Sequence, residues 1–110
     1  MADTQTVPLK AVPTATVNGL KVTLMADQSQ GDVCAFGWQA STAGDSGPFT
    51  FDPNSSEQGT KNPDGTYVSG SCKLIPIVCT VPKAGNYSFD LEVLDSKKNT
   101  NWGTINVQVK

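Results

Sequence analysis

The chain has 110 residues, 37% of them hydrophobic and 16% charged, enough for one compact domain with a single two-layer core. Its eight basic residues are all lysines and the net charge is −2, so nucleic-acid binding, which relies on basic patches and bidentate arginines, is not expected. The absence of histidine removes the usual general base near pH 7 and most zinc sites, so neither an enzyme nor a cofactor is predicted.

The two ends of the sequence bear on the compartment. No run of about 18 apolar residues is present, so membrane insertion is not expected. Residues 1–14 (MADTQTVPLKAVPT) lack the charged and apolar regions of a signal peptide, and the chain stops at NVQVK, directly on a predicted strand. We therefore expect residues 1–110 to be a single domain cut from a longer protein.

The first predicted elements are an edge strand and a turn. Residues 7–12 are extended but contain Pro8, and Pro13 follows. Because proline lacks the donor that a strand ladder needs, this segment predicts an edge strand. The dipeptide Asn18-Gly19 predicts a tight turn after it.

Two core strands are predicted next, over residues 20–26 and 33–41. In each run apolar side chains occur at every second position, the period of a half-buried strand. The inward residues are expected to be Leu20, Val22 and Leu24 in the first strand, and Cys34, Phe36 and Trp38 in the second.

A long polar loop is predicted over residues 42–71, interrupted by short apolar pieces at 49–51 and 66–68. Its carboxylates could bind Ca²⁺ through oxygen ligands, but no EF-hand spacing is present and solvated loop charges are the simpler interpretation. These carboxylates belong to Asp45, Asp52, Glu57 and Asp64.

The second half of the chain predicts three more strands with the same alternation, with a turn at residues 95–100 before the last of them. Their expected inward residues are Ile75, Ile77, Cys79 and Val81; then Tyr87, Phe89, Leu91 and Val93; and finally Ile105, Val107 and Val109. No segment has helical periodicity beyond about two turns. About seven short strands in one domain indicate an all-β, antiparallel immunoglobulin-like β-sandwich.

Several motifs resemble a PKD domain, an immunoglobulin-like module of surface and secreted proteins. The stretch GNYSFDLEVLDSKKNT, from Gly85, has that family's Gly-x-Tyr, alternating apolar residues and an Asp before a turn. LKVTLMADQS resembles its second strand and FGWQAS its aromatic-x-Trp strand, although Gln39 stands where an Asp usually follows the Trp. The resemblance implies a PKD-like accessory module that holds an enzyme near an insoluble substrate such as chitin, or that spaces domains.

Trp102 differs from Trp38 because it falls on the outward parity of its strand, unless Gly103 forms a bulge that turns it inward. In an immunoglobulin layout, polar residues of neighbouring strands would share its face. Such a face could bind a polysaccharide by stacking a sugar ring on the indole, and the alternative is a lone surface Trp.

Asp90 and Glu92 could also be a hydrolase pair, but they face solvent on one strand with no cleft implied. The candidate binding residues are Trp102, Gln39, Asp90, Glu92 and Asn106.

The three cysteines, Cys34, Cys72 and Cys79, allow at most one internal bridge. Cys34 and Cys79 fall on inward parities of strands expected in opposite sheets, which favours a disulfide between them. The alternative is three reduced thiols that pack as small apolar groups.

The sequence therefore predicts a non-catalytic module of a secreted or surface protein, with a polysaccharide or a protein surface as its partner. The competing prediction is a structural spacer or assembly domain that mediates protein–protein contact.

Overall fold

The computed structural model describes residues 8–42, 49–52 and 56–110. Within these residues the chain forms strands and no helix, which confirms the predicted all-β class, and no helix long and apolar enough to cross a membrane occurs there. The strands are β1 (Thr14–Asn18), β2 (Lys21–Met25), β3 (Ala35–Thr42), β4 (Thr50–Asp52), β5 (Ser56–Gln58), β6 (Ile77–Thr80), β7 (Gly85–Leu94) and β8 (Thr100–Val109).

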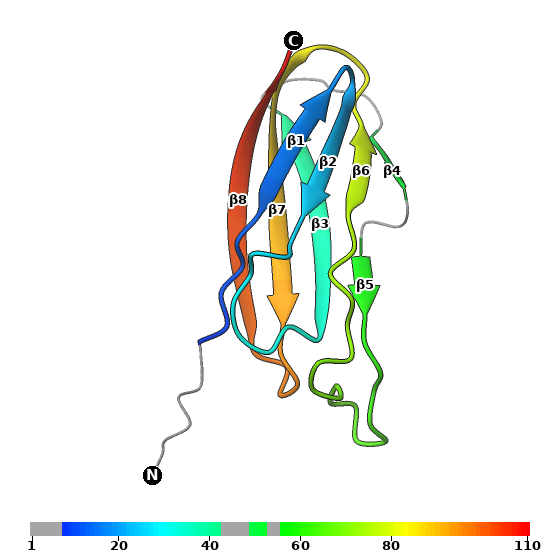
Figure 1. The fold of residues 1–110 in the computed structure, drawn as a ribbon, viewed down its shortest axis with the longest axis vertical. Coiled ribbons are helices and arrows are strands. Elements are labelled where there is room, and N and C mark those ends of the chain that lie inside the picture. The colour runs from blue at the N-terminus through cyan, green and yellow to red at the C-terminus, as the bar shows by residue number, and fades with distance from the viewer. Residues whose placement is uncertain (1–7, 43–48, 53–55) are drawn as a thin grey trace.

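The strands form two antiparallel sheets of four strands each (Figure 1). The sheet nearer the viewer in Figure 1, here called the front sheet, has the order β1-β2-β6-β4, and the rear sheet has the order β5-β3-β7-β8. The strands β4 and β5 fall within the predicted loop 42–71. Each has only three residues, which is too short for an alternating pattern to be recognised in the sequence.

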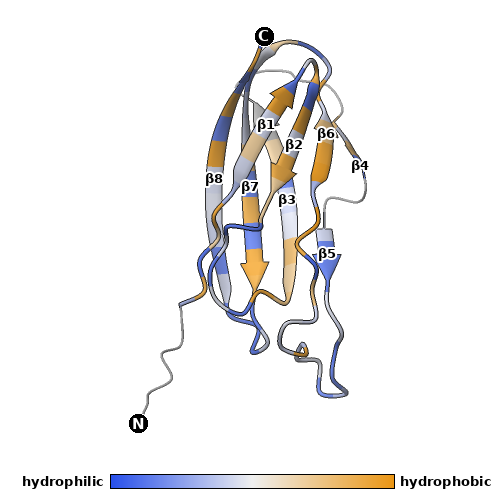
Figure 2. Cartoon of the chain, viewed as in Figure 1, coloured by the Kyte–Doolittle hydropathy of each residue, from blue (hydrophilic) through white to orange (hydrophobic). Residues whose placement is uncertain are grey.

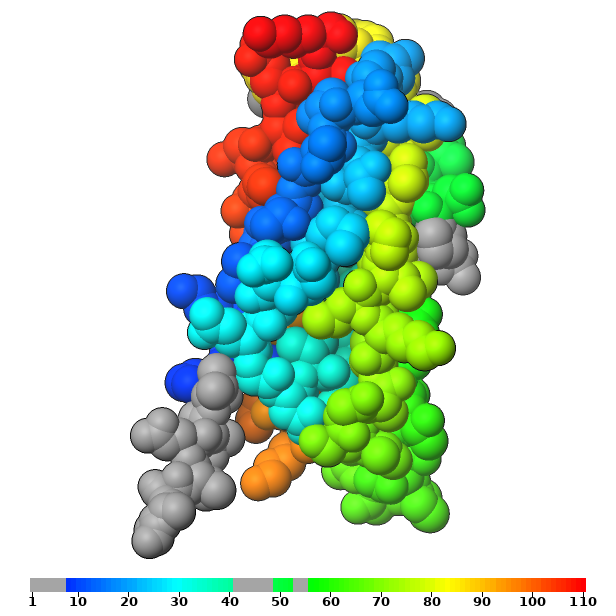
Figure 3. All heavy atoms as spheres, in the orientation of Figure 1, coloured from blue at the N-terminus to red at the C-terminus, as the bar shows by residue number. Residues whose placement is uncertain are grey.

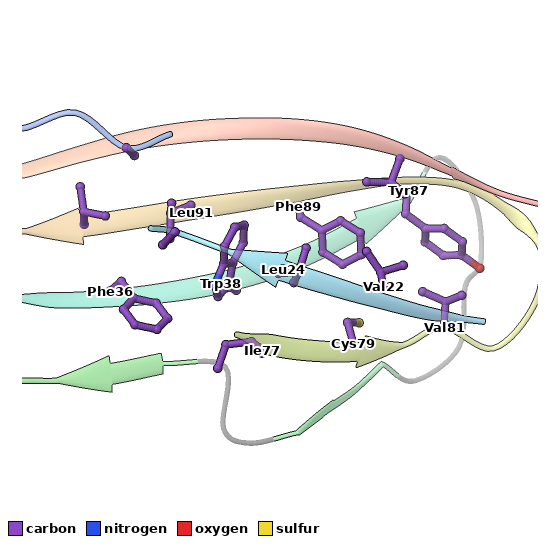
Figure 4. Close-up of a cluster of buried hydrophobic side chains, with 14 of the residues drawn as sticks. Val22, Leu24, Phe36, Trp38, Ile77, Cys79, Val81, Tyr87, Phe89 and Leu91 are labelled. Atoms are coloured by element: carbon purple, nitrogen blue, oxygen red, sulfur yellow. The ribbon is translucent and has the colours of Figure 1, made fainter. Parts of the chain in front are cut away.

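The core lies between the two sheets, which pack face to face (Figure 4). On β7 every second side chain is buried, and Figure 2 shows apolar and polar residues alternating along this strand. Trp38 is 3% exposed, which confirms its predicted place in the core. The most deeply buried large side chains are Phe36, Phe89, Leu24, Ile77, Leu91, Val22, Val81 and Val93.

The turn at Asn18-Gly19 is confirmed, but the inward orientation of Leu20 is wrong. Asn18 pairs with Lys21, so Gly19 and Leu20 form a two-residue turn between β1 and β2. Gly19 has φ of 63°, a left-handed conformation that glycine adopts without steric cost. Leu20 is 42% exposed because it belongs to the turn, and the buried alternation begins only at Val22.

The edge strand predicted over residues 7–12 is wrong for Pro8–Val12; Val7 lies outside the described residues. Only Lys10 pairs there, in an isolated bridge to Gln30 with two backbone hydrogen bonds of 3.0 and 2.9 Å. Pro8, two positions before the bridge, has no N–H to donate. Two positions after it, the Val12 N–H donates to the Ser29 hydroxyl at 2.9 Å instead of to a backbone carbonyl, so the ladder extends in neither direction. The first strand begins at Thr14, after Pro13.

Candidate binding site

The outer face of the rear sheet brings the five candidate binding residues together. Strand alternation turns them away from the core, and the registers of β3, β7 and β8 arrange them in rows across the sheet. The three rows are Gly37–Glu92–Trp102, Gln39–Asp90–Thr104 and Ser88–Asn106.

Trp102 is the most exposed large apolar side chain among the described residues. Its side chain is 52% exposed, against 42% for Leu20, the next highest. The other two exposed large apolar residues of the described chain are valines, so Trp102 is its one large exposed aromatic group. An exposed indole on a sheet face with polar neighbours gives a flat apolar surface that a planar or ring-shaped ligand can contact.

Gly103 does not form the bulge that would have turned Trp102 inward. The register of β8 with β7 runs without a break from Thr100 opposite Leu94 to Val109 opposite Gly85. Gly103 faces the interior, and a Cβ there would lie 2.8 Å from the carbonyl oxygen of Ala11 and 2.9 Å from Cδ of Pro13. The chain before β1 therefore packs directly on the backbone of β8, and Trp102 stays on the outer face.

Cross-strand hydrogen bonds hold two of the polar candidates in place. The Thr104 hydroxyl donates to Oδ1 of Asp90 at 2.6 Å, and the Ser88 hydroxyl donates to Oδ1 of Asn106 at 2.7 Å. Because each bond fixes a side chain before any ligand arrives, less rotamer entropy is lost on binding. Thr104 and Ser88 are thus supporting residues, and their parity in the sequence already predicts that they share this face.

An open hollow extends the polar surface along β7 and β8, toward the end of the sheet away from Trp102. Its volume is about 300 Å³, and Asn86, Ser88, Asn106 and Gln108 contribute to its lining. Trp102 and Gln108 are six positions apart on one strand, which corresponds to roughly 20 Å at about 3.4 Å per residue. The exposed indole and the hollow therefore lie along one line, with polar side chains between them.

A second hollow lies beside the loop that connects β5 to β6, and the sequence did not predict it. Its volume is about 400 Å³, and its lining includes Tyr67 and Lys97. Tyr67 is only 7% exposed, and the Lys61 ammonium lies 5.6 Å from the centre of its ring. The aromatic group is therefore already covered, and this hollow offers no flat apolar surface comparable to Trp102.

The disulfide predicted between Cys34 and Cys79 is not formed, and all three cysteines are free thiols. Both residues are buried, but Cys34 packs in a small separate cluster with Ala35 and Tyr67. Cys79 belongs to the main core, where it pairs with Val22 of β2 and lies near Val81 (Figure 4). Parity gives the face on which a side chain lies but not its position along the strand, and that position separates the two thiols.

Burial makes the thiols poor nucleophiles, which gives a prediction. Burial raises the pKa of Cys79 to about 11, and burial with the nearby Glu57 carboxylate raises that of Cys72 to about 11. Since the thiolate is the reactive form, roughly 0.1% of such a thiol is reactive at about pH 8, against about a quarter of an unperturbed cysteine. We expect iodoacetamide to label the folded protein slowly and to label three cysteines after unfolding without reductant. A peptide linking Cys34 to Cys79 in a non-reduced digest would contradict the structure.

The loop carboxylates do not converge in the part of the chain that the structure describes. Asp45 lies outside the described residues, Asp52 and Asp64 are exposed, and Glu57 is half-buried on β5. Among residues 8–42, 49–52 and 56–110 there is no group of three or more His, Cys, Asp or Glu side chains that could hold a metal ion.

Comparison of the chain with models of protein families, with characterised proteins and with solved structures finds no match. The geometry of the rear sheet and its side chains is therefore the basis for inferring function.

Proposed function

We propose that the two sheets form an immunoglobulin-like β-sandwich of the PKD-like kind. The orders β1-β2-β6-β4 and β5-β3-β7-β8 correspond to the A-B-E-D sheet of that fold and to its C-F-G sheet with one added strand. Trp38 is buried on β3, at the place of the core Trp of that fold. The Tyr87 hydroxyl, near the start of β7, donates to the carbonyl oxygen of Lys83 at 2.6 Å, the contact of a tyrosine corner.

We further propose that the domain is a non-catalytic binding module of a larger secreted or surface protein. Its ligand is an insoluble polysaccharide such as chitin, and the binding surface is the outer face of the rear sheet. The observation that carries this proposal is the 52% exposure of Trp102 beside Glu92, with the Asp90–Thr104 pair in the next row. An aromatic face attracts the C–H groups of a pyranose ring, while carboxylates and amides hydrogen-bond to its hydroxyls.

A bound polymer chain is expected to run along β8 on this surface. A chain that stacks on Trp102 and follows β8 passes Thr104 and Asn106 and reaches the hollow at Gln108. A site of this kind is weak when it acts alone. It becomes useful when it raises the effective concentration of a tethered catalytic domain near an insoluble substrate.

Replacement of Trp102 tests the proposal. Aromatic stacking contributes about 1–3 kcal/mol, so we expect Trp102→Ala to weaken pull-down on chitin beads by roughly 5- to 150-fold. The matched control is Leu20→Ala, because Leu20 is also apolar and 42% exposed but lies in the β1–β2 turn. Urea unfolding of both variants checks that the fold is intact. The proposal fails if the wild-type domain binds neither chitin nor cellulose, or if both variants lose binding equally.

The second candidate function is a spacer or assembly domain, and the positions of the chain ends favour it. In Figure 1 the blue segment before β1 lies toward the lower end of the two sheets, and the C-terminus lies at the upper end. A domain with this layout separates whatever is joined to its two ends. If the folded wild-type domain binds no polymer, the result supports the spacer or assembly function and not polysaccharide binding.

A further inference from the structure

The edge of the rear sheet at β8 differs from the other three sheet edges. The edge strands β4 and β5 have three residues each, and β1 has five and follows Pro13. The strand β8 has ten residues (TNWGTINVQV), none of them charged and none of them proline. Short length, charge and proline are the usual devices that keep a sheet edge from pairing with another chain. Among the described edge strands, β8 alone is long and contains neither a charged residue nor a proline.

The free side of β8 has no backbone partner within the described chain. In residues 8–42, 49–52 and 56–110, β8 pairs with β7 alone, and no other backbone hydrogen bond reaches it. About half of its residues therefore direct their N–H and C=O groups away from β7. In Figure 3, β8 lies at the left margin of the upper molecule, where this side can be reached.

The segment before β1 covers a face of β8, not its edge. A Cβ on Gly103 would point toward Ala11 and Pro13, and a Cβ stands out of the plane in which strands pair. The Ala11 N–H donates to the Asn101 side chain at 2.9 Å and not to the β8 backbone. The packing of this segment at Gly103 therefore leaves the ladder groups on the free side of β8 without backbone partners in the part of the chain that the structure describes.

The composition of β8 suits pairing with its own copy. Antiparallel neighbours place side chains of paired residues on the same face, and like charges that lie opposite each other destabilise the pair. The outward residues of β8 are polar or aromatic but uncharged: Thr100, Trp102, Thr104, Asn106 and Gln108. A second β8 thus meets no like charge in any register.

We propose that β8 pairs antiparallel with β8 of a second copy of this chain, which joins the two rear sheets into one continuous eight-stranded sheet. The two-fold axis stands perpendicular to that sheet, so both outer faces lie on the same side. In the proposed register the axis passes at Thr104, near the middle of β8 (Thr100–Val109), so each Thr104 lies opposite its counterpart. Both Trp102 side chains share the joined face, but the pairing itself does not depend on polysaccharide binding.

This interface is at the small end of specific interfaces, because one strand ladder is its main contact. The dimer is therefore expected to form at high micromolar concentrations and to dissociate on dilution. The symmetric contact closes on itself, so assembly stops at two copies.

Sedimentation velocity without ligand, over a wide range of concentration, tests the proposal with a matched pair of variants. Thr104→Lys places two ammonium groups close together across the joined edge, and we expect it to weaken dimerisation at least tenfold. Thr16→Lys makes the same substitution on the edge strand β1 and is expected to dimerise like the wild type. The proposal is overturned by a wild type that stays monomeric, by larger oligomers, or by equal effects of the two variants.

Hydrogen exchange of the wild type gives a readout that needs no variant. We expect protection of the edge-facing amides of β8 to rise with protein concentration, while the amides bonded to β7 stay protected throughout. If protection of these amides does not change with concentration, either no partner binds the edge or a segment of the same chain does. Either result overturns pairing with a second copy.

Discussion

Trp38→Ala is expected to lower the free energy of unfolding by about 3–5 kcal/mol, the usual cost of removing a buried large aromatic side chain. Trp38 is 3% exposed and lies between the sheets (Figure 4), packed in one core cluster with Leu24, Leu91 and Phe89. Its truncation leaves a cavity that the surrounding strands cannot close, because both sheets constrain them.

The variant Trp38→Phe separates the effect of the indole N–H from the effect of lost volume. Nε1 is buried and is the one buried side-chain nitrogen or oxygen without a hydrogen-bond partner among the described residues. An unpaired buried donor costs about 1–3 kcal/mol, and phenylalanine removes that donor while it fills much of the same volume. We expect Trp38→Phe to lose less than half as much stability as Trp38→Ala in urea unfolding. A loss below about 1 kcal/mol for Trp38→Ala would contradict the placement of this residue.

Gly103→Ala is expected to destabilise the fold by about 1–3 kcal/mol, the range for an overpacked site. The new Cβ would lie 2.8 Å from the Ala11 carbonyl oxygen and 2.9 Å from Pro13 Cδ, and neither a backbone oxygen nor a proline ring can rotate away. The segment at 11–13 must shift or β8 must bend. The measurement is the urea midpoint, together with the fluorescence of Trp102 as a probe of β8.

Gly37→Ala is the matched control for this substitution. Gly37 lies within β3, and a Cβ there would meet only Ser56 Cβ at 3.6 Å, an ordinary contact. Since glycine weakens a strand interior by roughly 0.5–1 kcal/mol relative to alanine, this variant is expected to be neutral or slightly more stable. Equal destabilisation by the two variants would mean that the segment before β1 does not pack on Gly103.

The long strands were predictable because each contains three or more apolar residues at every second position. Alternation along β7 and β8 placed Asp90, Glu92, Trp102 and Asn106 on one face, and the structure places them there. What this face binds does not follow from alternation, since polar side chains on a solvated sheet are ordinary. The rows of the site also depend on which residues of neighbouring strands lie opposite each other. The sequence of a single strand does not give that register.

The sequence-based predictions failed where the alternating pattern is short, and where alternation does not give the position of a residue along its strand. Leu20 continues the alternation of β2 in the sequence, yet the two-residue turn takes it out of the strand. Cys34 and Cys79 share inward parity, but they occupy different levels of the molecule. The strands β4 and β5 are three residues long, and pairing with β6 and β3 defines them more than their own residues do.

The directions of β1 and β8 determine how the domain responds to tension. In Figure 1 β1 and β8 both run upward, and β8 leads to the C-terminus, so a force that pulls the start of β1 away from the end of β8 acts along both strands. The bonds of an antiparallel ladder stand perpendicular to the strands, so this pull shears them and must break the β7–β8 rungs together. A pull across the ladder would open them one at a time. A force along β1 and β8 is therefore expected to meet its main resistance at the β7–β8 pair, in which both strands have ten residues.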